Sequence, residues 1–551
     1  MAHSMDEERL AQPDSVSIDN EKSSIHDKRP SEANGDNMKY PKGVELAAIV
    51  GSILLAMFLV ALDRTIIATA VPEISNQFNA LDDISWYASA YLLTSCATQL
   101  SWGKVYTYYS TKNVFLLAIL IFEVGSALCG GAPNSNTFIA GRAIAGIGSA
   151  GIFSGATVII AQIVPLTKRP MYVGLMGSTF GISSIVGPLL GGAFTDKITW
   201  RWCFYINLPI GGFTLVVLYL FLVVPPPRDS SIYTWTRQIL RLDPLGGVLF
   251  LCAVICFLLA LQWGGTTFAW ANGRIIALFV MSGVLMIAFV GVQIWLKADA
   301  TVPPRIFNQR SIVSGVLFAL CVGGGLISML YTLPLWFQGV RGTSAVKSGI
   351  DTIPMVLALV VGSILSGAII TRAGYYVPLM FVATIFMSIG SGLMTTFELD
   401  TNHAAWIGYQ VLFGIGIGSG MQQPSLAAQT VLPMEDVAIG VSLMFFAQSL
   451  GGAVLIAVSQ SLFQNFLRTE LPLIRGIDSS RILEAGATGL VDAVPANKLH
   501  EVLVVYNDGL RRSFIVSVAV SCLMIIPALT MEWRSIKKND APAPDTSASK
   551  S

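Results

Sequence analysis

The chain has 551 residues, of which 53% are hydrophobic and 12% are charged. Soluble domains carry about 25% charged residues, so this composition excludes an ordinary soluble protein and indicates a membrane protein. The formal net charge of +1 gives no reason to expect nucleic acid or a polyanionic partner.

Residues 1–44 are polar and lack the apolar segment of a signal peptide, which predicts a disordered cytoplasmic tail. Beyond them, apolar runs of about 20 residues recur, each long enough to cross the bilayer as a helix. We predict fourteen transmembrane helices, at residues 46–70, 85–104, 114–132, 138–164, 171–194, 203–224, 243–263, 275–296, 311–338, 349–371, 377–397, 404–430, 437–464 and 512–532.

These elements predict an all-α membrane protein in which two six-helix bundles flank two inserted helices. We expect the first bundle at 45–224, a linker with the two extra helices at 225–300, and the second bundle at 301–532. A long outer loop is expected at 465–511, and residues 533–551 form a second tail. Lys and Arg are more frequent in the short loops on the side of the N-terminus, which predicts that both termini are cytoplasmic.

An internal repeat relates the two bundles. The segment 142–148, Arg-x-x-x-Gly-x-Gly in the fourth helix, has a counterpart at 410–416, Gln-x-x-x-Gly-x-Gly in the twelfth, and 103–112 matches 367–376 at a similar offset. Two such halves are a transporter architecture, with the substrate site between them near the midplane of the membrane. The alternative is chance similarity, because small residues serve packing in transmembrane helices generally.

One arginine stands inside an apolar helix. Arg142 lies roughly 8 Å below the expected outer surface, where a charged side chain is costly unless it has a partner or a wet cavity. Asp63, at a similar depth in the first helix, is the expected partner, and opening the pair would move Asp63 between charged and neutral forms. The alternative is a static cluster of Asp63, Arg64 and Arg142. Glu123 in the third helix is a second candidate for proton coupling.

Glycines in the fourth and fifth helices predict close helix packing. Gly146 and Gly148 belong to a stretch of small residues that lets neighbouring helices approach. In the fifth helix a proline removes a backbone donor among further glycines, which predicts a bent, tightly packed element. A kink of this kind is common and by itself weak evidence. The residues of this element are Gly187, Pro188, Gly191 and Gly192.

The sequence contains no pattern typical of catalysis. Its four histidines and seven cysteines are scattered, without a Cys-x-x-Cys pair, and no Gly-x-x-x-x-Gly-Lys-Ser/Thr loop occurs. We therefore expect no enzyme, no metal site and no cofactor, and we expect that an ion gradient supplies the energy.

Four motifs resemble the major facilitator superfamily, and within it the fungal fourteen-helix drug:proton antiporters. They are 62–65 with Pro72, 142–148, 187–192, and 201–212, which reads Arg-Trp-Cys-Phe-Tyr-Ile-Asn-Leu-Pro-Ile-Gly-Gly and is the most specific. The resemblance covers all fourteen helices. It implies that Arg142 is the motif B arginine linked to proton transfer, that Asp63 is its acidic partner, and that 187–192 is associated with export.

One motif of the family is altered here. Its motif A usually carries Asp and Arg where this chain has Thr107 and Tyr108. The charge-relay gate attributed to that loop is therefore not implied for this chain.

We expect a proton-coupled exporter of small, moderately apolar molecules such as drugs, toxins or secondary metabolites. It would work as a plasma-membrane monomer by alternating access. A vacuolar location, and a carrier of amino acids or siderophores on the same fold, are the alternatives. Helices one, four, nine and twelve would line the cavity. Residues expected to contact substrate, although Tyr and Trp near span ends also serve as interface anchors, are Gln410, Gln422, Tyr331 and Trp336.

Overall fold

The computed structural model describes residues 41–80, 83–224, 241–265, 267–474, 476–479, 482, 490 and 494–537. Most of the expected N-terminal tail, most of the linker before the inserted helices and the end of the C-terminal tail lie outside these residues. The elements below all belong to one compact unit, Lys42–Ser551.

The first half of the chain forms five long helices and a sixth in two pieces. They are α1 (Val44–Phe78), α2 (Ile84–Tyr108), α3 (Thr111–Gly130), α4 (Ser135–Ile163), α5 (Arg169–Lys197), and α6 (Trp202–Tyr205) followed by α7 (Asn207–Phe221). Two inserted helices follow, α9 (Pro244–Trp263) and α10 (Gly273–Leu296), and the short α11 (Pro304–Phe307) leads into the second half.

The second half repeats this order with more interruptions. It consists of α12 (Arg310–Gly339), α13 (Ala345–Asp351), α14 (Ile353–Ala373), α15 (Val377–Met394), α16 (His403–Gly420), α17 (Gln423–Val431), α18 (Val437–Glu470), α20 (Leu499–Leu523) and α21 (Ile525–Thr530).

Twelve helices in the described part of the chain are long and apolar enough to cross a membrane. The other two of the fourteen predicted helices are α2 and the pair α16–α17. The chain breaks between α16 and α17 at Met421 and Gln422, and Pro424 in the first turn of α17 lacks the N–H that a continuous helix needs. The fold is thus the predicted all-α membrane protein.

The long outer loop expected at 465–511 is shorter in the structure. The helix α18 continues to Glu470, and α20 begins at Leu499 rather than at 512. Buried side chains at Val502, Tyr506 and Leu510 recur every four residues and place this amphipathic start of α20 against the second half. Charged residues between them hide the helix from a search for continuous apolar runs.

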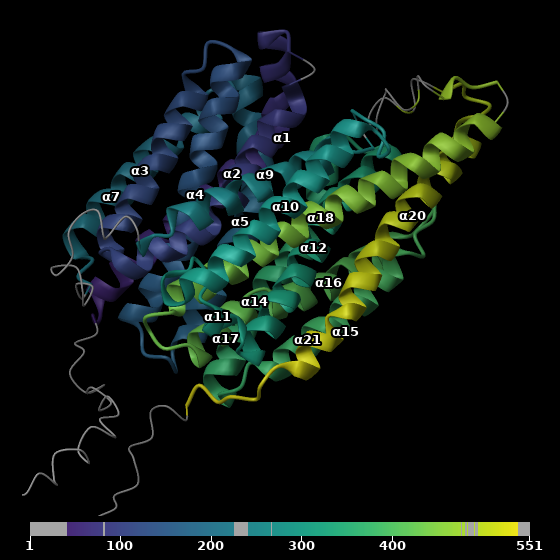
Figure 1. The fold of residues 1–551 in the computed structure, drawn as a ribbon. Coiled ribbons are helices and arrows are strands. Elements are labelled where there is room, and N and C mark those ends of the chain that lie inside the picture. The colour runs from purple at the N-terminus through teal and green to yellow at the C-terminus, as the bar shows by residue number, and fades with distance from the viewer. Residues whose placement is uncertain are drawn as a thin grey trace, which may run out of the picture. The chain divides into compact units, whose positions relative to one another are not determined.

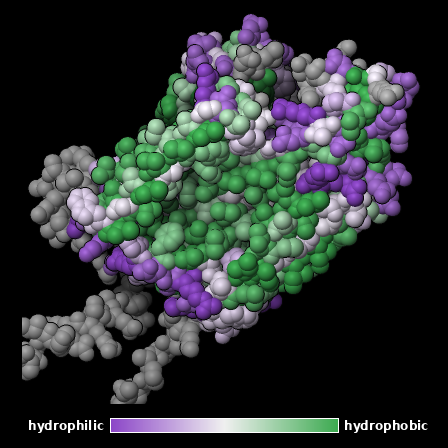
Figure 2. Space-filling view, turned by 45° about the vertical axis from the view of Figure 1, so that its right-hand side comes forward, coloured by the Kyte–Doolittle hydropathy of each residue, from purple (hydrophilic) through white to green (hydrophobic). Residues whose placement is uncertain are grey.

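Large apolar side chains are exposed along the outside of the bundle, as a lipid environment requires. On α7, Phe213, Val216 and Leu220 are exposed, and α10 exposes Val280 and Ile287 among others. Figure 2 shows one face whose central part is hollowed and mostly hydrophobic, with hydrophilic residues toward its edges.

The predicted internal repeat is visible in how glycines pack. A Cβ added to Gly148 of α4 would lie 2.5 Å from the backbone nitrogen of Phe122 on α3, and one added to Gly416 of α16 would lie 2.6 Å from that of Met387 on α15. The pair α3–α4 therefore packs as α15–α16 does, which confirms that the fourth and twelfth helices are equivalent.

The two halves meet along the pairs α2–α18 and α5–α14. We call the basal end the one at which α2, α10 and α14 end and α5, α12 and α18 begin. There Ser442 of α18 donates to Ser154 of α4 at 3.0 Å, and Ser363 of α14 donates to the carbonyl of Gly174 on α5 at 2.9 Å.

The inserted helices pack on one of these two contacts. Phe250 of α9 contacts Phe446 of α18 with ring centroids 5.0 Å apart, and Phe289 of α10 at 5.1 Å. The same apolar cluster includes Leu100 of α2 and Met444 of α18. Figure 1 shows α9 and α10 side by side. The helix α9 packs against both α2 and α18, and α10 packs on α9, so α9 covers the α2–α18 contact.

Candidate transport site

A buried ion pair links α1 to α4. The Nη1 of Arg142 lies 2.5 Å from Oδ2 of Asp63, and the side chains are 1% and 0% exposed. The Nε of Arg142 donates to the carbonyl of Tyr87 on α2 at 2.9 Å, and its guanidinium lies over the ring of Tyr91, 4.5 Å from the centroid. The expected partnership is present, and its role in proton transfer stays a prediction.

The environment of this pair is asymmetric. The other carboxylate oxygen of Asp63, Oδ1, is buried without a hydrogen-bond partner among the described residues. A buried acceptor without a donor costs free energy, so this carboxylate is not fully satisfied. Oδ1 of Asp63 can therefore accept a further hydrogen bond.

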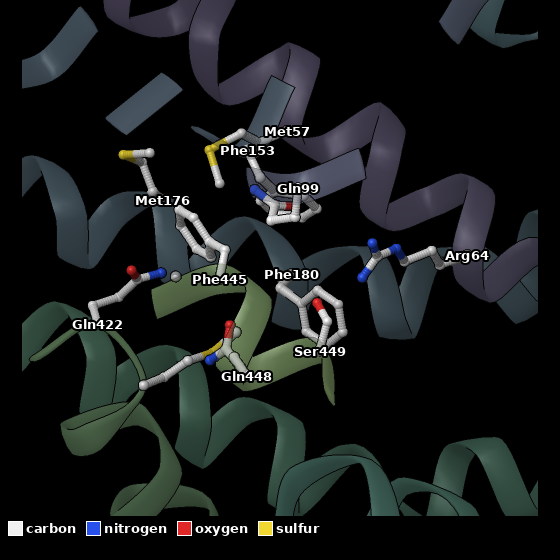
Figure 3. Close-up of a pocket in the computed structure, with 12 residues that line it drawn as sticks. Met57, Arg64, Gln99, Phe153, Met176, Phe180, Gln422, Phe445, Gln448 and Ser449 are labelled. Atoms are coloured by element: carbon white, nitrogen blue, oxygen red, sulfur yellow. The ribbon is translucent and has the colours of Figure 1, made fainter. Parts of the chain in front are cut away.

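A cavity lies between the two halves. The space in it that is open to the centre of a water-sized molecule is about 40 Å³. Figure 3 shows side chains from both halves converging on it. It is lined by Met57 and Arg64 of α1, Gln99 of α2, Phe153 of α4, Met176, Gly177 and Phe180 of α5, Met421 and Gln422 between α16 and α17, and Phe445, Gln448 and Ser449 of α18.

This lining only partly matches the expected one. Helices one, four and twelve contribute, but α12, the ninth, does not contribute to this lining, whereas α2, α5 and α18 do. Of the four expected contacts, Gln422 lies in the cavity wall. It is available there because the chain breaks between α16 and α17, which sequence periodicity did not show.

The other three expected contacts lie elsewhere. Gln410 is fully buried and donates to the carbonyl of Asp351 at 3.0 Å. Trp336 is also fully buried and donates to Asn507 at 2.9 Å, so it anchors α12 to α20. Tyr331 lines a second, smaller pocket within the second half, with residues of α18 and α20.

Glu123 of α3 is not among the described residues that line the cavity. It is 6% exposed and packs against Gly211 of α7, where an added Cβ would overlap its carboxylate. In the described part of the chain no hydrogen bond or ion pair joins it to Asp63 or Arg142. No direct contact with the Asp63–Arg142 pair therefore supports the expected role of Glu123 in proton coupling.

The glycines of α5 hold it against α1. A Cβ at Gly187 would overlap Thr65, and one at Gly191 would lie 2.7 Å from the carbonyl of Ile66, whereas Gly192 has nothing within 4 Å. Pro188 stands inside α5, which still runs unbroken from Arg169 to Lys197. Gly187 and Gly191 thus lie at the close approach of α5 to α1, whereas Gly192 faces open space.

The altered motif A loop has contacts of its own at the basal end. The Nζ of Lys104 donates to the carbonyl of Asp299, just after α10, and lies over the ring of Tyr108 at 5.2 Å. Nearby, Arg305 pairs with Asp436 at the start of α18 at 2.8 Å. The segment after the inserted helices thus contacts the loop in which the usual Asp and Arg are missing.

Three lining residues, Arg64, Gln99 and Gln448, were not expected in the cavity from the sequence. Each is a polar side chain in an otherwise apolar helix, which is itself a signal of a site inside the membrane. The apolar periodicity did not show which way these side chains face, because the spans are apolar around most of their circumference.

Comparison with known proteins agrees with this architecture. The sequence model described as Major Facilitator Superfamily matches residues 53–456. The chain belongs to the major facilitator superfamily. It is 56% identical over 502 residues to the rubrofusarin-specific efflux pump aurT of Gibberella zeae, covering 91% of this chain and 92% of that one. It is 50% identical over 499 residues to the efflux pump aflT of Aspergillus parasiticus, covering 90% and 97%.

Among solved structures, the human organic anion transporter MFSD10 matches with a TM-score of 0.58 and 14% identity, covering 89% of this chain and all of that one. At this identity the likeness shows the fold alone. Family membership and the relatives show that this chain is a multi-pass membrane transporter of small molecules and not an enzyme.

Proposed function

We propose that this chain is a proton-coupled exporter of small, moderately apolar molecules, such as toxins or other secondary metabolites. The buried Asp63–Arg142 pair beside a cavity between the two halves carries the proposal. The relatives named as efflux pumps support the direction of transport. We also propose a plasma-membrane monomer with both termini in the cytoplasm.

Protonation of Asp63 is the coupling step in this proposal. An added proton removes the negative charge that compensates Arg142, and breaking a buried pair from one side costs about 3–5 kcal/mol. The contact between α1 and α4 then weakens. Because Arg64 of the same α1 lies in the cavity wall, a movement of α1 changes the surface that the substrate meets.

Alternating access would come from the contacts at the basal end. A Cβ at Gly103 of α2 would lie 2.9 Å from that of Ser442 on α18, and one at Gly367 of α14 would lie 2.5 Å from the carbonyl of Pro170. These contacts close the end that we expect to face the cytoplasm. Export requires that they separate to admit substrate and re-form to release it outside.

The test is uptake into inverted vesicles that contain the full chain and have an acidic lumen. The probes are 1-hydroxy-2-naphthoate and its methyl ester, with an amino-acid mixture and a ferric siderophore as the alternative cargo. Wild type should accumulate an aromatic probe only under the pH gradient, and Asp63→Asn and Arg142→Ala should lose this response. Asp196→Asn, an exposed residue of α5, is the control. Unchanged gradient-driven uptake in both variants, or uptake of amino acids or siderophore alone, would refute the proposal.

A further inference from the structure

Arg64 points away from the ion pair that its neighbour Asp63 makes. Successive residues of a helix do not share a face, so Asp63 faces α4 while Arg64 faces the cavity. Figure 3 shows its side chain leaving α1 at one edge of the cavity, with the guanidinium directed toward the middle of the lining group.

The guanidinium of Arg64 is poorly satisfied. Its Nη2 donates to Ser95 Oγ at 3.2 Å, and its centre lies 5.3 Å from the ring of Tyr91 and 5.2 Å from that of Phe153. Its Nε is buried and has no hydrogen-bond partner among the described residues. In the described part of the chain no carboxylate pairs with it, although a guanidinium has five N–H donors and is costly to hold in a membrane.

The remaining cavity wall is apolar and aromatic with a few amides. Phe153, Phe180 and Phe445 supply aromatic rings, and Gln448 supplies a neutral amide. The amide nitrogen of Gln99 already donates to Ser154 Oγ and to the carbonyl of Ala150. Asp, Glu and Lys are absent from the described lining, so Arg64 is its one charged residue. The wall offers ring contacts to an aromatic molecule, and Arg64 offers its positive charge to a negative group.

We propose that Arg64 determines specificity by binding an acidic oxygen, a carboxylate or phenolate, on an aromatic substrate. The rings of Tyr91 and Phe153 hold the guanidinium over their faces, and the side chain lines the cavity. A charge-assisted hydrogen bond forms there, while the phenylalanines contact the substrate rings. This inference rests on the proposed function, since it names the class of substrate for the same cavity.

A purely structural role predicts something different. If Arg64 only balanced Asp63, its guanidinium would approach that carboxylate, but Asp63 is joined to Arg142. Arg64 instead contacts a hydroxyl and two rings. The alternative of a static three-residue cluster therefore lacks the contact that it requires.

The experiment measures binding to the purified full chain in detergent by quenching of intrinsic tryptophan fluorescence. The probes are 1-hydroxy-2-naphthoate and its methyl ester, which share the ring system and differ in charge. Wild type should bind the anion at least about tenfold more tightly than the ester, the effect of one charge-assisted hydrogen bond. Arg64→Gln should abolish this preference, Arg64→Lys should keep part of it, and Arg274→Gln, at an exposed arginine, should keep all of it.

Several outcomes would overturn the inference. These are equal or absent binding of the two probes by wild type, or an anion preference that survives in Arg64→Gln. The wild-type comparison decides even if Arg64→Gln does not fold. If the ester is still taken up under the pH gradient while the anion preference is absent, the exporter stands and the role of Arg64 falls. If the anion preference is present but the pH gradient drives no uptake, the proposed function is refuted and the role of Arg64 in binding stands.

Discussion

Gln410 occupies in the second half the place that Arg142 occupies in the first. The Nε of Arg142 donates to the carbonyl of Tyr87 near the start of α2 at 2.9 Å, and Nε2 of Gln410 donates to the carbonyl of Asp351 just before α14 at 3.0 Å. Both halves thus contain a hydrogen bond between equivalent helices, but only the first half has a charged side chain at this position. Proton coupling is therefore expected to depend on the first half.

The first prediction compares these two positions in the vesicle uptake assay. Arg142→Ala removes the partner of Asp63 and should lower the initial rate of gradient-driven uptake at least about tenfold, as expected when an ion pair is lost. Gln410→Ala removes a neutral hydrogen bond and should leave the rate within about twofold. An equal loss in both variants would show that the two positions act alike.

A second prediction concerns the stability of the ion pair itself. Asp63→Asn or Arg142→Gln alone leaves one buried group poorly compensated and should lower the free energy of unfolding by about 3–5 kcal/mol. The double variant should lose less than the sum of the single losses, because it leaves no buried charge unpaired. Thermal unfolding of the detergent-purified protein measures all four forms. Additive losses would mean that the two charges do not interact.

The sequence predicted most of the scaffold because hydropathy and small-residue spacing report on lipid contact and helix packing. Fourteen spans, the repeat and the partnership of Asp63 with Arg142 all follow from these local patterns. The start of α20 at Leu499 was missed because its charged residues interrupt the apolar pattern, although Val502 and Leu510 are buried.

The cavity was harder to predict than the scaffold. Its wall depends on the rotation of each helix about its own axis, and spans that are apolar on most sides carry little signal for rotation. Gln422 was predicted to line the cavity and does so, but Gln410 and Trp336 form hydrogen bonds between helices instead. Both are buried polar groups with partners, and no sequence pattern distinguishes such a group from one that faces a ligand.

A third prediction uses two neighbouring glycines as a matched pair. Gly191→Ala places a methyl group 2.7 Å from the carbonyl of Ile66, so α5 must move away from α1, and overpacking costs about 1–3 kcal/mol. Gly192→Ala meets nothing within 4 Å and should change stability by less than about 0.5 kcal/mol. The midpoint of thermal unfolding checks both. Equal midpoints would mean that α5 is not tightly held.

A fourth prediction concerns the base of the inserted helices. The carboxylate of Asp243, 1% exposed, accepts from the backbone of Gly246 at 2.7 Å, from Gln293 at 2.8 Å, and from Thr301 through its backbone at 3.0 Å and its hydroxyl at 2.8 Å. It therefore joins α9, α10 and the segment that follows them.

Asp243→Ala leaves these buried donors unsatisfied, at about 1–3 kcal/mol for each group that finds no other partner. We expect lower thermal stability and faster proteolysis after α10, with Asp196→Ala unchanged as the control on an exposed carboxylate. Limited proteolysis of the purified protein, followed by mass spectrometry, locates the cleavage. Wild-type resistance in Asp243→Ala would show that the inserted helices are held by their apolar contacts alone.

The last prediction concerns a disulfide cross-link between α4 and α18 at the basal end. Ser154 of α4 and Ser442 of α18 are both buried, their hydroxyls are 3.0 Å apart, and they lie on opposite halves. Cysteines at both positions bring their sulfur atoms near one another, and a disulfide forms where the Cβ atoms lie about 3.5–4.5 Å apart. If transport requires the halves to separate there, oxidation of Ser154→Cys/Ser442→Cys should abolish uptake into inverted vesicles, and a reductant should restore it. Each single variant, treated in the same way, controls for oxidation of the native cysteines. Full uptake by the oxidised double variant, with the cross-link verified by mass spectrometry, would mean that the basal contact stays closed during transport and that substrate enters by another route.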